Sequence, residues 1–154
     1  MRRCLVLIVA LAALVLPASS VAVGDANNRL LGRTVWPAKG TVTSPFGPRG
    51  GRMHQGIDIG MLRSLRVRSA SAGRVTAVGY LTGYEGYGNV VLVRQRGYQM
   101  LYAHLSRVQV KKGQRVRVGQ RLGVAGCTGS CTDTHLHFEV RRGGPRMNPM
   151  RYLP

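Results

Sequence analysis

The sequence has very few acidic residues: five Asp and Glu stand against 23 Lys and Arg in 154 residues, giving a formal net charge of +18. Such an imbalance indicates either a well-solvated basic surface or a polyanionic partner. One class of basic protein binds nucleic acid or a membrane surface through charge alone, and its affinity falls steeply with salt but does not change when a chelator is added. The N-terminus has the pattern of an export signal, described next, and an exported protein does not meet nucleic acid as its usual partner. We therefore expect no nucleic-acid partner.

Long apolar runs are also absent. The longest is the 12 residues from Leu5 to Leu16, whereas a bilayer-spanning helix needs about 20. The run follows Arg2 and Arg3 and precedes the small residues Ser20 to Ala22, a pattern typical of a secretory signal. We therefore predict a signal peptide over residues 1–22, with an uncleaved anchor as the alternative. The exported protein would lie in the periplasm, the cell wall or the extracellular space, where anionic cell-wall polymers and lipid head groups are the expected polyanions.

Aromatic residues make up only 6% of the chain and apolar residues 44%, enough for one core and little more. We expect a monomer with a single domain over residues 36–154, preceded by a short polar lead over residues 23–35. Sustained helical spacing of apolar residues is missing from this domain. Short strand-type segments separated by glycine take its place, at 74–78, 89–95, 98–104, 115–118, 122–125 and 135–140. The pattern predicts a mostly β, antiparallel fold, with a tight hairpin at Arg96-Gly97.

Histidine is scarce as well, with four in the chain, and two of them lie one residue apart in the last predicted strand. Alternate side chains of a strand share a face, so His135 and His137 would stand about 7 Å apart on one side. That arrangement suits an open metal site, where one imidazole binds the ion and its neighbour reaches the water bound to it.

The other two histidines lie in separate segments. His54 and Asp58 are four residues apart, but the surrounding glycines and prolines make a helix unfavourable, so the chain must bend between them, and Gly56 allows this. Taken alone, this pattern is equally typical of a surface loop. His104 ends a predicted strand in which Met100, Tyr102 and His104 would share one face. A single histidine there is usually packed or hydrogen-bonded, yet no histidine of the chain lies outside these three segments.

These segments, in this order and spacing, resemble the lysostaphin-type (LytM) zinc metallopeptidases of the M23 family. The resemblance rests on the HxxxD of residues 54–58, the YAHLS of 102–106 and the HLHFEV of 135–140, and is supported by SPFGPR at 44–49 and GYGN at 86–89. It implies a small β fold with an open groove, a single zinc ion and hydrolysis of peptide bonds in peptidoglycan. By the family pattern His54, Asp58 and His137 would bind zinc, and His104 and His135 would be catalytic.

The chemistry of these residue types is compatible with that reading. Two neutral imidazoles and one carboxylate leave a zinc ion at +1 with a fourth position open, which lowers the pKa of a bound water toward neutrality. Either remaining histidine can take the proton, and the sequence does not decide which one does. The alternative is a non-catalytic wall-binding module or amidase activator on the same fold. Such proteins typically lack one or more of these residues, so the intact set favours the enzyme.

Three features stay open. Cys127 and Cys131 allow a disulfide in an exported protein, while the rival is a closed zinc site that they would form with His135 and His137. Glu139 is either a base or ligand, or the partner of one of the many arginines. The segment 61–68 is basic where the family usually has a loop with Gly and Pro, so substrate preference can differ there.

Overall fold

The structure, a computed structural model, describes residues 31–154, and its elements are almost entirely antiparallel strands. The large sheet has the order β1 (Lys39–Ser44), β4 (Ile57–Ser64), β12 (Leu136–Arg142), β8 (Tyr98–Ala103), β7 (Asn89–Gln95), β6 (Gly73–Tyr80), β10 (Arg115–Val116), with β13 (Arg146–Met147) beside β12. The smaller sheets are β5 (Arg66–Arg68), β11 (Arg121–Ala125), β9 (Leu105–Val108), and the hairpin β2 (Gly47–Arg49), β3 (Arg52–His54). Two 3₁₀ turns, Glu85–Tyr87 and Pro149–Arg151, complete the fold, which confirms the mostly β prediction.

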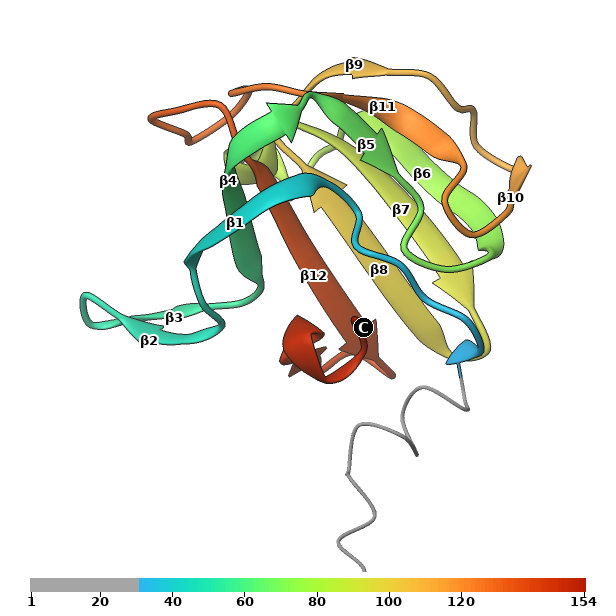
Figure 1. The fold of residues 1–154 in the computed structure, drawn as a ribbon, viewed down its shortest axis with the longest axis horizontal. Coiled ribbons are helices and arrows are strands. Elements are labelled where there is room, and N and C mark those ends of the chain that lie inside the picture. Colours follow the sequence, from blue (N-terminus) through green and yellow to red (C-terminus); the bar gives the residue numbers. More distant parts are fainter. Residues whose placement is uncertain (1–30) are drawn as a thin grey trace, which may run out of the picture.

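The core lies between the large sheet and the three-stranded sheet. The three-stranded sheet covers one end of the large sheet (Figure 1). Strand alternation explains this arrangement. Tyr102 on β8 and Phe138 on β12 point into the core, where their tilted rings have centroids 5.2 Å apart, while the next residues along each strand point to the other face. Each such side chain, once buried, contributes roughly 1.5–3 kcal/mol to stability. The other face carries a smaller apolar cluster, built on Val90, Leu92, Leu101, Ala103.

The sequence located several strands well and missed others. β7 has the predicted bounds, and the Arg96-Gly97 hairpin forms with positive φ angles of 46° and 81°. The predicted strand at 115–118 stops at Val116, because Arg117 and Gln120 close a turn through a 3.1 Å backbone hydrogen bond. Strands β1 to β5, β9 and β13 were not predicted, and the basic segment 61–68 forms the second half of β4 and all of β5 rather than a loop.

The N-terminal predictions lie outside this description. The signal peptide predicted over residues 1–22 and most of the polar lead fall among the residues that the structure does not describe. Between residues 31 and 154, no helix is long and apolar enough to cross a membrane.

Candidate metal centre and groove

Strand register brings the predicted metal ligands together. His137 on β12 is paired directly with Asp58 on β4, and His54 at the end of β3 folds back over both. Asp58 Oδ1 lies 2.8 Å from His137 Nδ1 and 3.2 Å from His54 Nε2, and the two nitrogens are 3.2 Å apart. A tetrahedral zinc site with bonds near 2.1 Å places its ligand atoms about 3.4 Å apart. The donor types and spacing of this trio therefore fit a zinc ion.

Gly56 is the bend that makes this approach possible. It lies between β3 and β4, and a Cβ added there would collide with the carbonyl oxygen of Phe138 and come within 2.9 Å of His137 Nε2. A larger residue would push the start of β4 away from β12. The sequence expectation that Gly56 turns the chain is confirmed, and the close approach to β12 is a second reason for glycine at this position.

The backbone conformation of His104 turns its side chain into the groove. Ala103 pairs with His137 and shares its face, so simple alternation would place His104 on the opposite face with Tyr102, as the strand pattern predicted. That shared face is not found, and His104 instead lines the groove, where the family resemblance placed it. A positive φ of 60° swings the imidazole to the groove side, where its centroid lies 4.7 Å from that of His135. The αL conformation is uncommon for a residue with a side chain, and it marks strain at a candidate functional position.

Both histidines of the HLH segment line the groove, as predicted, although they are held differently. His137 belongs to β12, whereas His135 precedes the strand and makes only an isolated bridge to Gly126. His135 Nε2 lies 3.7 Å from Asp58 Oδ1, close to the ligand trio but outside it.

Each of the four histidines has one ring nitrogen bound to an oxygen acceptor on the protein. His54 Nδ1 donates to the carbonyl of Pro45 at 2.7 Å, and His104 Nδ1 donates to the carbonyl of Thr128 at 2.8 Å. His135 Nδ1 donates in the same way to the carbonyl of Asp133 at 2.8 Å.

His137 completes the set, because its Nε2 donates to Glu139 Oε1 at 3.2 Å. These bonds fix the tautomers, so the remaining nitrogen of every ring carries its lone pair toward the shared space.

Glu139 supports the site from below. It is fully buried, and besides His137 it accepts from Tyr87 Oη at 2.6 Å and from Arg141 Nε at 2.7 Å. Glu139 contacts the trio only through the outer nitrogen of His137 and is not among the residues whose ligand atoms lie together, so its position does not support the base or ligand hypothesis, and the ion pair with an arginine is confirmed. The sequence reasoning passed over Arg141, although it follows Glu139 by two residues and so shares its strand face.

When no metal is bound, the carboxylates of the site favour a protonated His137, against the effect of its burial, and raise the pKa of that imidazole. Burial opposes the charge of Asp58, but a protonated His137 and the neighbouring imidazoles outweigh it and lower the carboxyl pKa to about 2. Burial lowers the pKa of His104 below its usual value, against its bond to Thr128, so the ring is neutral at pH 7. Burial and the bond to Glu139 raise the pKa of Tyr87 to about 12, so it remains a donor.

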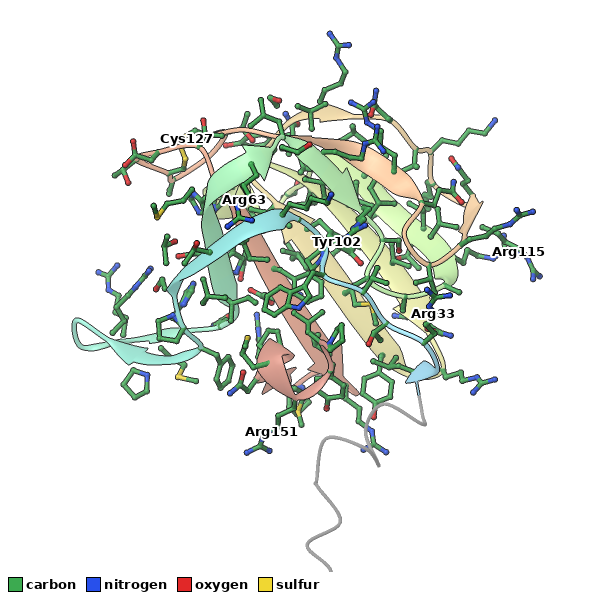
Figure 2. The ribbon with its side chains drawn as sticks, viewed as in Figure 1. Arg33, Arg63, Tyr102, Arg115, Cys127 and Arg151 are labelled. Carbon is green, nitrogen blue, oxygen red and sulfur yellow. A yellow bond between two sulfur atoms is a disulfide. The ribbon has the colours of Figure 1, made fainter. Side chains whose placement is uncertain are left out.

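The four histidines and Asp58 line a groove of about 660 Å³. The loop from Cys127 to Cys131 borders this groove on one side. The two cysteines form a disulfide, and the Cys127 loop stands at the edge of the molecule (Figure 2). The rival closed zinc site is therefore excluded, because both thiols are consumed and His137 faces Asp58. On the opposite side, Arg49 Nη1 lies 3.2 Å from Asp58 Oδ2.

The chain is similar in sequence and fold to several known proteins. The murein hydrolase activator NlpD of Escherichia coli is 37% identical over 120 residues, 77% of this chain and 31% of the relative. A zinc-containing peptidase from Vibrio cholerae matches with a TM-score of 0.66 and 32% identity, over 79% of this chain and 39% of that one. Lysostaphin from Staphylococcus simulans matches with a TM-score of 0.69 and 28% identity, over 79% and 52%.

The chain spans less than half the length of the curated relatives it matches. The model of peptidase family M23 matches residues 52–149, a range that includes all four histidines and Asp58. With the antiparallel fold and the His-Asp-His trio already described, this match establishes that the chain belongs to peptidase family M23.

Proposed function

We propose that this protein is an exported zinc endopeptidase that hydrolyses peptide bonds of peptidoglycan. One observation carries the proposal: four imidazoles and one carboxylate converge on one groove, each imidazole with its outer nitrogen bound to an oxygen acceptor. A protein that only binds the wall has no need for two further histidines with free nitrogens beside a metal trio.

His54, Asp58 and His137 are the proposed zinc ligands, through Nε2, Oδ1 and Nδ1. A zinc ion in this position would supply Lewis-acid chemistry, polarising the scissile carbonyl and making water acidic enough to attack at neutral pH. The acceptors Pro45 and Glu139 hold the two ligand rings in orientation.

His104 and His135 are the proposed catalytic residues. Each has a free Nε2 on the groove, and the low pKa of His104 leaves it neutral and able to accept a proton from the attacking water. The other imidazole can hydrogen-bond the oxygen on which negative charge develops, or return a proton to the leaving amine. Which ring has which role stays open.

A second candidate is that the protein activates another wall hydrolase. The observation that favours it is the 37% identity to a protein whose name is murein hydrolase activator. In that case the groove would dock a partner enzyme, and the histidines would not need to turn over substrate. Both candidates imply a peptidoglycan-associated role outside the cytoplasm, which agrees with the predicted signal over residues 1–22.

Two variants test the proposal and its roles together. His137→Ala should lose both zinc and wall cleavage, whereas His104→Ala should keep zinc and lose cleavage, because only the first is a ligand. Zinc content by elemental analysis and release of wall fragments are measured on the same preparations. Loss of zinc from both variants, or from neither, contradicts the assignment. Stimulation of a purified wall amidase by both zinc-free and zinc-loaded protein, without cleavage, would favour the activator.

A further inference from the structure

A row of arginines crosses the large sheet at one register position. On neighbouring strands, Arg115 of β10 is paired directly with Arg74 of β6, and Arg74 is paired with Arg94 of β7. The row continues through Gln99 of β8, Arg141 of β12 and Arg146 of β13. These strands lie side by side in Figure 1, and Arg115 stands at the opposite edge of the molecule from Cys127 in Figure 2.

The row lies on the same face of the sheet as the metal trio. Residues paired directly across strands share a face, and on β12 the alternation of His137, Glu139 and Arg141 places all three on the groove side. Arg141 follows His137 by four residues, about 13 Å along the strand. The row therefore runs across the sheet beside the groove, at right angles to the strands.

Three of these arginines have no acidic partner among residues 31–154. Arg141 and Arg146 share Glu139, but in the part of the chain that the structure describes no carboxylate lies within 4.0 Å of Arg74, Arg94 or Arg115. Arg74 has one polar contact, to the carbonyl of Gly113 at 2.8 Å. Like charges directly opposite on neighbouring strands destabilise a sheet, so this pairing of arginines does not contribute to the stability of the fold.

The surface along the row is hollowed. A depression of about 1090 Å³ is lined by Arg74, Arg115 and Arg117, and a second of about 550 Å³ by Arg94, Gln99 and Arg141. The first three positions of the row lie within about 10 Å, two strand spacings, so one extended anionic segment can reach all of their guanidinium groups. Guanidinium groups bind carboxylates through paired hydrogen bonds.

We propose that this row, Arg74, Arg94 and Arg115 above all, binds the free carboxylates of the stem peptides of peptidoglycan while the same polymer occupies the groove. The inference rests on the proposed function, because it takes the wall as the substrate. We choose this partner because the row and the groove lie on one face of the sheet, so one polymer can contact both. The wall presents carboxylates on successive stem peptides. The row would hold the polymer in position and lower KM rather than take part in bond cleavage.

The test compares two triple variants of equal charge. Arg74→Gln, Arg94→Gln and Arg115→Gln remove the row, while the matched control changes Arg66, Arg107 and Arg121 to Gln, three exposed arginines on the smaller sheet. Binding of the full chain, as exported from an expression host, is measured by co-sedimentation with peptidoglycan stripped of accessory polymers. Chelator and ice prevent cleavage. The double variant Arg94→Gln and Arg115→Gln keeps the Arg74 hydrogen bond in case the triple variant is unstable.

The row variant should bind roughly tenfold more weakly than the control, because exposed ion pairs are individually weak and three are lost. The difference should vanish at high salt and on peptidoglycan whose carboxyl groups have been amidated. Equal loss in both triple variants, or loss only on walls that retain phosphodiester polymers, overturns the proposal. Binding that depends on the row, without any cleavage of the wall, would contradict the proposed endopeptidase activity but support the proposed role of the row.

Discussion

Replacing Glu139 by Gln tests how the site is held. Glu139 is fully buried and accepts hydrogen bonds from His137, Tyr87 and Arg141. A glutamine presents one oxygen and one amide group, so one of these donors must face another donor, and Arg141, only 8% exposed, loses its counter-charge. Breaking a buried ion pair in this way costs about 3–5 kcal/mol of unfolding free energy. A neutral amide oxygen is a weaker acceptor for His137 than the carboxylate, which should also lower zinc affinity by roughly 10- to 100-fold.

The assay is denaturant unfolding with and without zinc, combined with a competitive zinc titration. Glu85→Gln is the matched control, because Glu85 is exposed and the same charge is removed. Adding Arg141→Gln to Glu139→Gln should recover part of the lost stability, since no buried charge is then left alone. Equal stability and zinc affinity of Glu139→Gln and Glu85→Gln would refute the reasoning.

Two other changes act on the surroundings of the site. Gly56→Ala should destabilise the protein and weaken zinc binding in thermal and metal titrations, whereas Gly86→Ala, whose added Cβ meets only Ser130 Oγ at 3.7 Å, should leave stability nearly unchanged. Equal effects of the two would argue against the close approach of β4 to β12. Cys127→Ser with Cys131→Ser should cost on the order of 2 kcal/mol in chemical unfolding and lower kcat with zinc content kept, because the loop carries the carbonyl that orients His104. Unchanged kcat would contradict that role of the loop.

Local pattern was enough to predict much of the fold, whereas the set of candidate site residues came from the resemblance of three segments to a known family. The alternation of residues in 135–140 and the hairpin at Arg96-Gly97 are properties of single segments, and both are found in the structure. The pairing of Asp58 with His137, by contrast, depends on the register between strands 79 residues apart, which no local pattern specifies.

The errors have physical causes as well. His104 was placed on the wrong face because alternation assumes extended backbone, and its φ of 60° breaks that assumption. Glu139 was considered for catalysis because it shares a face with His137, but the same periodicity also places Arg141 there as its partner. The row of arginines could not be predicted, since its members are spread over residues 74 to 146 and meet only through strand register.

The most direct test of the account is digestion of purified peptidoglycan by the exported protein, with fragments identified by mass spectrometry. Parallel samples contain a chelator, or a chelator followed by added zinc. The account predicts fragments from cleaved peptide bonds that disappear with the chelator and return with zinc, and the fragment masses would identify the bond. Absence of fragments from several wall types, with protein shown to be folded and zinc-loaded, would contradict the endopeptidase.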